Sequence, residues 1–92
     1  MAWRTYQKAT ATTRVMLMNE SKNRTAITLM HASSNLIYIS HDSEISTTNG
    51  LKIPANTPVY FSEELGHDVK SEMYVIANSG TDVITVREDY QD

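Results

Sequence analysis

The residues best suited to metal chemistry lie in two short segments of the chain. His41, Asp42 and Glu44 stand close together, and His67 is followed by Asp68. Imidazole and carboxylate groups bind divalent metals, but neither segment holds enough ligands for a tetrahedral or octahedral set. We therefore interpret both segments as solvent-exposed turns and expect neither a metal site nor a cofactor.

Hydrolytic chemistry is not expected either. A serine nucleophile needs a base and an orienting group, often at a Gly-x-Ser-x-Gly elbow, and the chain lacks that motif. The adjacent carboxylates Glu63 and Glu64 would point to opposite faces of an extended segment, so they cannot flank one bond. The glycines at positions 50, 66 and 80 form no phosphate-binding loop. The sequence therefore predicts a protein that is not an enzyme.

Charge divides the chain unevenly and indicates binding. Residues 1–24 hold five basic residues and one acidic residue, whereas residues 25–92 hold three basic and ten acidic residues. Such asymmetry is typical of a protein that binds a partner or its own copies. Because most of the chain is acidic and the sequence isoelectric point is about 5.5, nucleic acid is not expected as that partner.

Residues 1–13 show no clear hydrophobic period. We expect this segment to be an extended N-terminal arm that projects from a β-sandwich domain formed by residues 14–92. Indole and phenol rings are enriched at interfaces. Two methionines of the next segment, expected to share one strand face, would extend the contact. The predicted interface comprises Trp3, Arg4, Tyr6, Lys8, Arg14, Met16 and Met18.

Length and composition limit the architecture to one small domain. The chain has 92 residues and no cysteine, so no disulfide can stabilise it and association between copies becomes more important. No stretch approaches the roughly 18 apolar residues that a membrane span needs. We therefore expect no membrane partner.

The remaining pattern is that of β structure. Short apolar or alternating runs, bounded by turn residues, predict strands over residues 15–18, 26–30, 36–39, 45–48, 58–61, 73–77 and 83–87. The Ser-Gly turn between the last two predicts a hairpin of residues 72–78 with residues 82–87. Residues 62–66 predict a single helical turn, with Ser62 as its cap and Gly66 as its end. The expected fold is all-β, a small antiparallel β-sandwich or jelly-roll-like barrel.

Residues 35–88 carry a family resemblance. They begin with Asn-Leu-Ile-Tyr-Ile-Ser, reach a Thr-Thr-Asn-Gly turn at residue 50, and continue with Met-Tyr-Val-Ile-Ala from residue 73. A Ser-Gly turn and Val-Ile-Thr-Val-Arg-Glu complete the series. This order resembles small tailed-phage virion proteins of the capsid decoration (cement) type. Ser40 and Asn56 stand where that pattern usually has glycine, and Arg87 replaces a common aliphatic residue.

The resemblance implies a non-enzymatic virion protein that binds and stabilises the assembled capsid shell. Its partners would be the major capsid protein and copies of itself, as a dimer or trimer. It would lie on the capsid exterior after synthesis in the host cytoplasm. The alternative function is a carbohydrate- or receptor-binding module, or another small head or tail component. In that case the central aromatic candidates for stacking on sugar are Tyr38, Tyr60, Phe61 and Tyr74.

Overall fold

The computed structural model describes residues 2–91, which form eight strands and one short 3-10 helix. The elements are β1 (Ala2–Ala9), β2 (Val15–Met18), β3 (Arg24–His31), β4 (Ile37–Ser40), β5 (Leu51–Ile53), β6 (Val59–Ser62), η1 (Glu63–Leu65), β7 (Met73–Ala77) and β8 (Val83–Tyr90). The fold is all-β, as predicted, with two antiparallel sheets of four strands each. None of the described segments is a helix long and apolar enough to cross a membrane.

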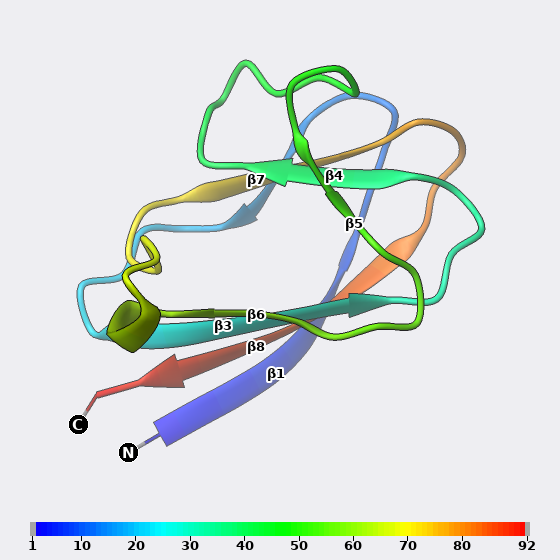
Figure 1. Ribbon diagram of the computed structural model, residues 1–92. Helices are drawn as coiled ribbons and strands as arrows, with labels where there is room; N and C mark the ends of the chain where they lie inside the picture. The colour runs from blue at the N-terminus through cyan, green and yellow to red at the C-terminus, as the bar shows by residue number, and fades with distance from the viewer. Residues whose placement is uncertain (1, 92) are drawn as a thin grey trace.

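The strand order identifies the sandwich as a jelly roll. Sheet A has the order β1-β8-β3-β6, and sheet B has the order β2-β7-β4-β5. The pairs β4–β5, β3–β6, β2–β7 and β1–β8 are nested, so the chain resembles one long antiparallel ribbon wrapped into two layers. Figure 1 shows the strands β4 and β7 of sheet B above the strands β1, β3, β6 and β8 of sheet A.

Alternating aliphatic side chains build the core between the sheets. On sheet A, Ile27 and Leu29 of β3 and Val86 of β8 are completely buried. On sheet B, Ile37 of β4 and Val75 of β7 are also completely buried. Each such side chain contributes about 1.5–3 kcal/mol relative to an exposed one. This shared apolar layer holds the two sheets together without any disulfide.

Residues 1–13 do not project from the domain as the expected arm, as far as the structure describes them. Residues 2–9 form β1, which pairs with β8 along its whole length. Sequence patterning missed this strand because its inward-facing side carries Arg4, Tyr6 and Lys8 instead of aliphatic residues. β1 is a strand because it pairs with β8, although its own sequence lacks an alternating apolar pattern.

The expected hairpin of residues 72–78 and 82–87 is wrong. Strand β7 lies in sheet B and β8 in sheet A, so the turn at Gly80 crosses from one sheet to the other. Each strand has two neighbours in its own sheet, which leaves no edge for pairing with the other. The expected strand over residues 45–48 is also wrong, because these residues lie in the loop between β4 and β5.

The predicted helical turn at residues 62–66 is confirmed. The hydroxyl of Ser62 accepts a hydrogen bond from the backbone N–H of Glu64 at 3.2 Å. Gly66 ends the turn with a φ of 86°, a conformation that favours glycine. Asn56 has a φ of 59°, as its place in a turn and its tolerance of left-handed backbone suggested. These features are set by neighbours in the sequence.

Candidate functional site

The outer face of sheet B is partly covered by the chain itself. Residues 41–50, which join β4 to β5, fold over it, and Figure 1 shows this loop above β4, away from sheet A. Ile45 is only 6% exposed. A Cβ atom placed on Gly50 would lie 2.7 Å from the Cβ of Tyr38 and 3.2 Å from Ile45 Cδ1. The loop therefore packs directly on the sheet and fills that part of its surface.

The outer face of sheet A has no such cover from the described residues. Among the side chains that the register places on it are nine that we call the open face: Trp3, Thr5, Gln7, Thr28, Met30, Tyr60, Thr85, Arg87 and Asp89. Trp3 is 60% exposed and Tyr60 is 53% exposed. An exposed sheet face with large aromatic side chains among polar ones is the composition expected of a binding surface.

A shallow groove of about 790 Å³ runs along part of the open face. Tyr60, Glu63 and Glu64 border it on the side of β6 and η1. Arg87 and Asp89 border it on the side of β8. The groove thus combines an exposed aromatic ring with both signs of charge, and its size is within the usual range of ligand sites.

Trp3 and Arg87 form one unit at the β1–β8 side of the open face. The guanidinium carbon of Arg87 lies 4.5 Å from the centre of the Trp3 ring. Arg87 Nη2 also lies 3.1 Å from Asp89 Oδ1. A cation that stacks on an indole and pairs with a carboxylate has a restricted orientation. The unit therefore offers a partner a pre-organised patch.

Beneath this end of sheet A lies a buried carboxylate between two arginines. Glu88 and Arg24 have side chains that are 1% exposed, and Arg24 Nη1 lies 2.5 Å from Glu88 Oε1. Arg4 Nη2, which is on the rim, lies 2.9 Å from Glu88 Oε2. Because the central pair is shielded from solvent, no substrate can reach it. We assign it a structural role.

Arg24 also anchors two loops. Its Nε donates to the carbonyl of Val69 at 2.5 Å, Nη1 to Asn19 at 3.0 Å and Nη2 to Ser71 at 3.0 Å. The guanidinium thereby donates to three backbone carbonyls besides Glu88, of which the bond to Val69 is fully buried. Within residues 2–91, no buried side-chain nitrogen or oxygen is left without a partner. Removal of Arg24 would therefore leave several polar groups unsatisfied at once.

The buried carboxylate predicts a loss of stability in acid. Burial by itself raises the pKa of Glu88, but hydrogen bonds from Arg24, Tyr6 and Arg4 outweigh it and hold the pKa below the ordinary value of 4.5. A carboxyl whose pKa is lower in the folded state stabilises the fold above its unfolded pKa. That contribution disappears as the pH falls through the folded-state pKa. We expect the melting temperature, followed by circular dichroism, to fall below about pH 4.5 partly for this reason.

Glu88→Gln supplies the control for this pH dependence. The variant is expected to be less stable at neutral pH, but its unfolding should take up fewer protons in acid, by at most about one. An acid dependence identical to that of the wild type would show that Glu88 does not titrate in this way.

The histidines that could do chemistry are held by backbone groups. The two ring nitrogens of His41 lie 2.8 and 3.0 Å from the carbonyl oxygens of Glu72 and Asp68. His67 Nδ1 accepts the backbone N–H of Ser62 at 3.0 Å. Within the described part of the chain, no group of three or more His, Asp or Glu residues is placed to hold a metal ion. The two sequence segments with metal-binding residue types therefore serve as loop supports.

Two arginines of the predicted interface pair within their own chain. Arg4 binds Glu88, and Arg14 lies 3.6 Å from Glu44 Oε1 and donates to the carbonyl of Ser43. The basic first quarter of the chain is thus partly neutralised by acidic residues of the same molecule. A second copy of the chain is therefore not needed to supply acidic partners for these two arginines.

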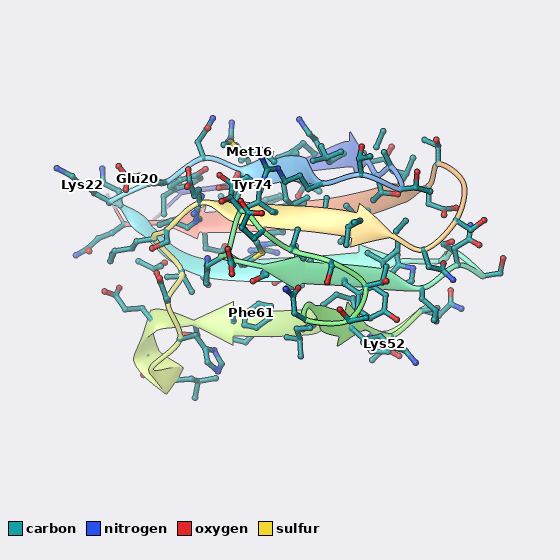
Figure 2. All side chains as sticks on the ribbon, turned by 90° about the horizontal axis from the view of Figure 1, so that it is seen from above. Met16, Glu20, Lys22, Lys52, Phe61 and Tyr74 are labelled. Atoms are coloured by element: carbon teal, nitrogen blue, oxygen red, sulfur yellow. The ribbon has the colours of Figure 1, made fainter. Side chains whose placement is uncertain are left out.

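The other predicted interface residues are spread over different surfaces. Trp3 is on the open face, and Tyr6 and Lys8 are half-buried on the opposite side of β1. A bulge in β2 between Met16 and Met18 separates the two methionines that we expected on one face. Met18 is buried in the core. Met16 lies beside Tyr74 on the outer side of sheet B (Figure 2), so the seven residues do not form one patch.

Sequence patterning missed the charged residues of β8. Ile84 and Val86 share the inward side of this strand, and Glu88 continues their period of two. A carboxylate in a core position implies a buried cation, which is the signal that could have revealed the network. Arg87 and Asp89, on the opposite side of the strand, could then have been assigned to an outer face.

Fold and site together define a small jelly-roll domain in which a loop covers part of the outer face of sheet B and the outer face of sheet A is open. Comparisons with protein-family models, curated proteins and solved structures find no match for this chain. Function must therefore be argued from the open face and from the residues around it.

Proposed function

We propose that this protein is a non-enzymatic virion structural protein, a capsid decoration (cement) protein that binds the assembled shell through its open face. The observation that carries the proposal is the difference between the two outer faces. The loop of residues 41–50 covers part of sheet B and leaves Met16 exposed there, whereas sheet A presents two large aromatic rings, those of Trp3 and Tyr60, together with Met30. Large apolar side chains gathered on one face are suited to a protein partner.

Two further points support the proposal. The resemblance to small tailed-phage virion proteins extends over residues 35–88, which include β4 to β7 and most of β8. Jelly rolls occur in viral capsid domains and also in lectins, so the fold admits both proposed functions and chooses neither. The proposed partners are the major capsid protein and further copies of this chain on the capsid exterior.

The test uses heads of the encoding virus that were assembled without this protein. The wild type should bind them in a sedimentation assay and raise their melting temperature. Trp3→Ala combined with Tyr60→Ala should weaken binding at least about tenfold, because exposed aromatic anchors dominate interface energies. The matched control is Met16→Ala with Tyr74→Ala on sheet B, which should bind like the wild type. Equal binding by both double variants would overturn docking through the open face.

A saccharide is the second candidate ligand of the same face. The observation that favours it is the exposed ring of Tyr60, which borders a groove that also presents Arg87, Asp89 and Glu64. Sugars can stack on such a ring while their hydroxyl groups bond to the charged groups around it. If the wild type fails to bind heads but binds on a glycan array, and Tyr60→Ala abolishes that glycan binding, the saccharide function replaces the capsid function.

A further inference from the structure

We infer that β1 is an exchangeable strand, which can leave its own sheet and take the same place beside β8 of a second copy. This inference does not rest on capsid docking, because it concerns the edge of sheet A and not its open face. The partner is a second copy of this chain, and the segment that it receives is residues 2–11.

The side chains of β1 hold it to its own domain through few contacts, namely the stack of Trp3 with Arg87 and the bonds of Arg4 and Tyr6 to Glu88, all of which an exchanged strand would form again. β1 is an edge strand that pairs with β8 alone, and six of its eight residues are exposed. Tyr6 is the residue of β1 that packs against the hydrophobic core, and it is only half-buried. Arg4 binds Glu88, but Glu88 keeps Arg24 as a partner when Arg4 leaves. Detachment therefore exposes little apolar surface of β1 itself.

The edge of sheet A that β1 covers, by contrast, needs a strand beside β8. Without β1, the backbone of β8 becomes an edge eight residues long, next to the completely buried side chains of Ile84 and Val86. An open strand edge beside a core readily pairs with another strand. An identical β1 from a second copy restores every contact, including the pair of Arg4 with Glu88. Strand exchange between identical chains therefore costs few contacts.

Backbone hydrogen bonds hold the C-terminal end of the exchanged segment, and a short hinge follows it. The backbone N–H of Thr10 donates to the carbonyl of Asp82 at 2.7 Å, and the N–H of Asp82 donates to Thr10 Oγ1 at 3.1 Å. The carbonyl of Ala11 accepts the N–H of Ala77 at 2.9 Å. The chain then bends at the exposed residues Thr12 and Thr13 before β2 begins.

The hydrogen bonds of Thr10 with Asp82 and of Ala11 with Ala77 can form equally well in a second copy. Thr10 and Ala11 belong to the exchanged segment, whereas Asp82 and Ala77 would belong to the copy that receives it. The hinge that remains, residues 12–14, spans at most about 10 Å when fully extended. Exchange therefore occurs between copies in direct contact. Inside one chain the short hinge gives β1 an effective concentration of about millimolar, so exchange between free chains needs protein at a similar concentration.

Cysteine pairs on separate chains test this inference, since the natural chain has no cysteine. Gln7 of β1 lies opposite Thr85 of β8, and Met30 of the central strand β3 lies opposite the same Thr85. Q7C chains are mixed with T85C chains, unfolded together, refolded and oxidised. The control mixture is M30C with T85C, because β3 has neighbours on both sides and cannot exchange. Gln7 and Met30 are both exposed, so random collisions affect both mixtures alike.

The readout is the amount of disulfide-linked heterodimer on a non-reducing gel. After refolding at about 1 mM, Q7C with T85C should give at least about fivefold more heterodimer than the control mixture, and this excess should vanish at about 10 µM. Equal yields in the two mixtures at high concentration would overturn exchange of β1. Head binding by the wild type would be unaffected by that result, so the two proposals fail separately.

Discussion

Arg24→Met is expected to lower the free energy of unfolding by about 3–5 kcal/mol, because it leaves a buried carboxylate without its main partner. Glu88 is 1% exposed and lies 2.5 Å from the arginine that the variant removes. The carbonyls of Val69 and Ser71 also lose their donor. A domain of this size has roughly 5–14 kcal/mol of stability in total. The loss is therefore a large share of the total, and urea denaturation followed by circular dichroism should show a much lower midpoint.

Arg87→Met is the matched control for this measurement. Arg87 is also an arginine in an ion pair, with Asp89, but its side chain is 46% exposed. Exposed pairs contribute only about 0–1 kcal/mol. If Arg24→Met costs no more than Arg87→Met, the buried network is not a major determinant of stability. The double variant Arg24→Met with Glu88→Met should recover part of the loss, since no unpaired buried charge remains.

Gly50→Ala is expected to cost about 1–3 kcal/mol by overpacking the contact between a loop and a sheet. The new methyl group would be placed 2.7 Å from the Cβ of Tyr38, an atom that cannot rotate away. The backbone of the loop must therefore shift, and Ile45 must shift with it. Thermal unfolding measures the loss, and faster hydrogen exchange in β4 would show that the loop has lifted from sheet B.

Thr47→Ala, in the same loop, controls for any general sensitivity of this segment. Thr47 is exposed, and a surface substitution of this kind usually changes stability by no more than about 0.5 kcal/mol. Similar losses from Thr47→Ala and Gly50→Ala would contradict the packing explanation. Gly50 does not have a positive φ, so glycine is needed there for the close approach of the loop to Tyr38.

The local features of this fold could be predicted because neighbouring residues decide them. The run at residues 36–39 is apolar on both faces and predicts a central strand, and the strand found there, β4, lies between β7 and β5. The proline at position 58 predicts either a strand start or a sheet edge, and the strand that follows it, β6, begins at the next residue and lies at an edge. The Ser62–Gly66 turn carries its own cap and its own end signal. Alternation, capping and turn chemistry act over a few residues and are visible in the sequence.

The composition of the candidate site could be predicted only in part. Trp3 was expected at a binding surface because of its ring, and the structure places it on the open face. Tyr60 could have been either a core residue or a surface residue, since β strands favour aromatic rings in both places. Met18 was expected at an interface and lies in the core, because a bulge changes the alternation of β2. A bulge leaves no clear mark on a four-residue strand.

Composition and local patterning were enough to predict a small all-β domain without disulfides, most of its strands and a basic first quarter. The partners of those basic residues became visible only in the folded chain. Arg24 meets Glu88 across 64 positions of sequence, and Arg4 meets the same carboxylate across 84. The tertiary structure also decided that residues 2–9 are a strand and that sheet A keeps an open face. The physical reason is that long-range pairing depends on backbone hydrogen bonds and shared burial, which no local pattern of residues specifies.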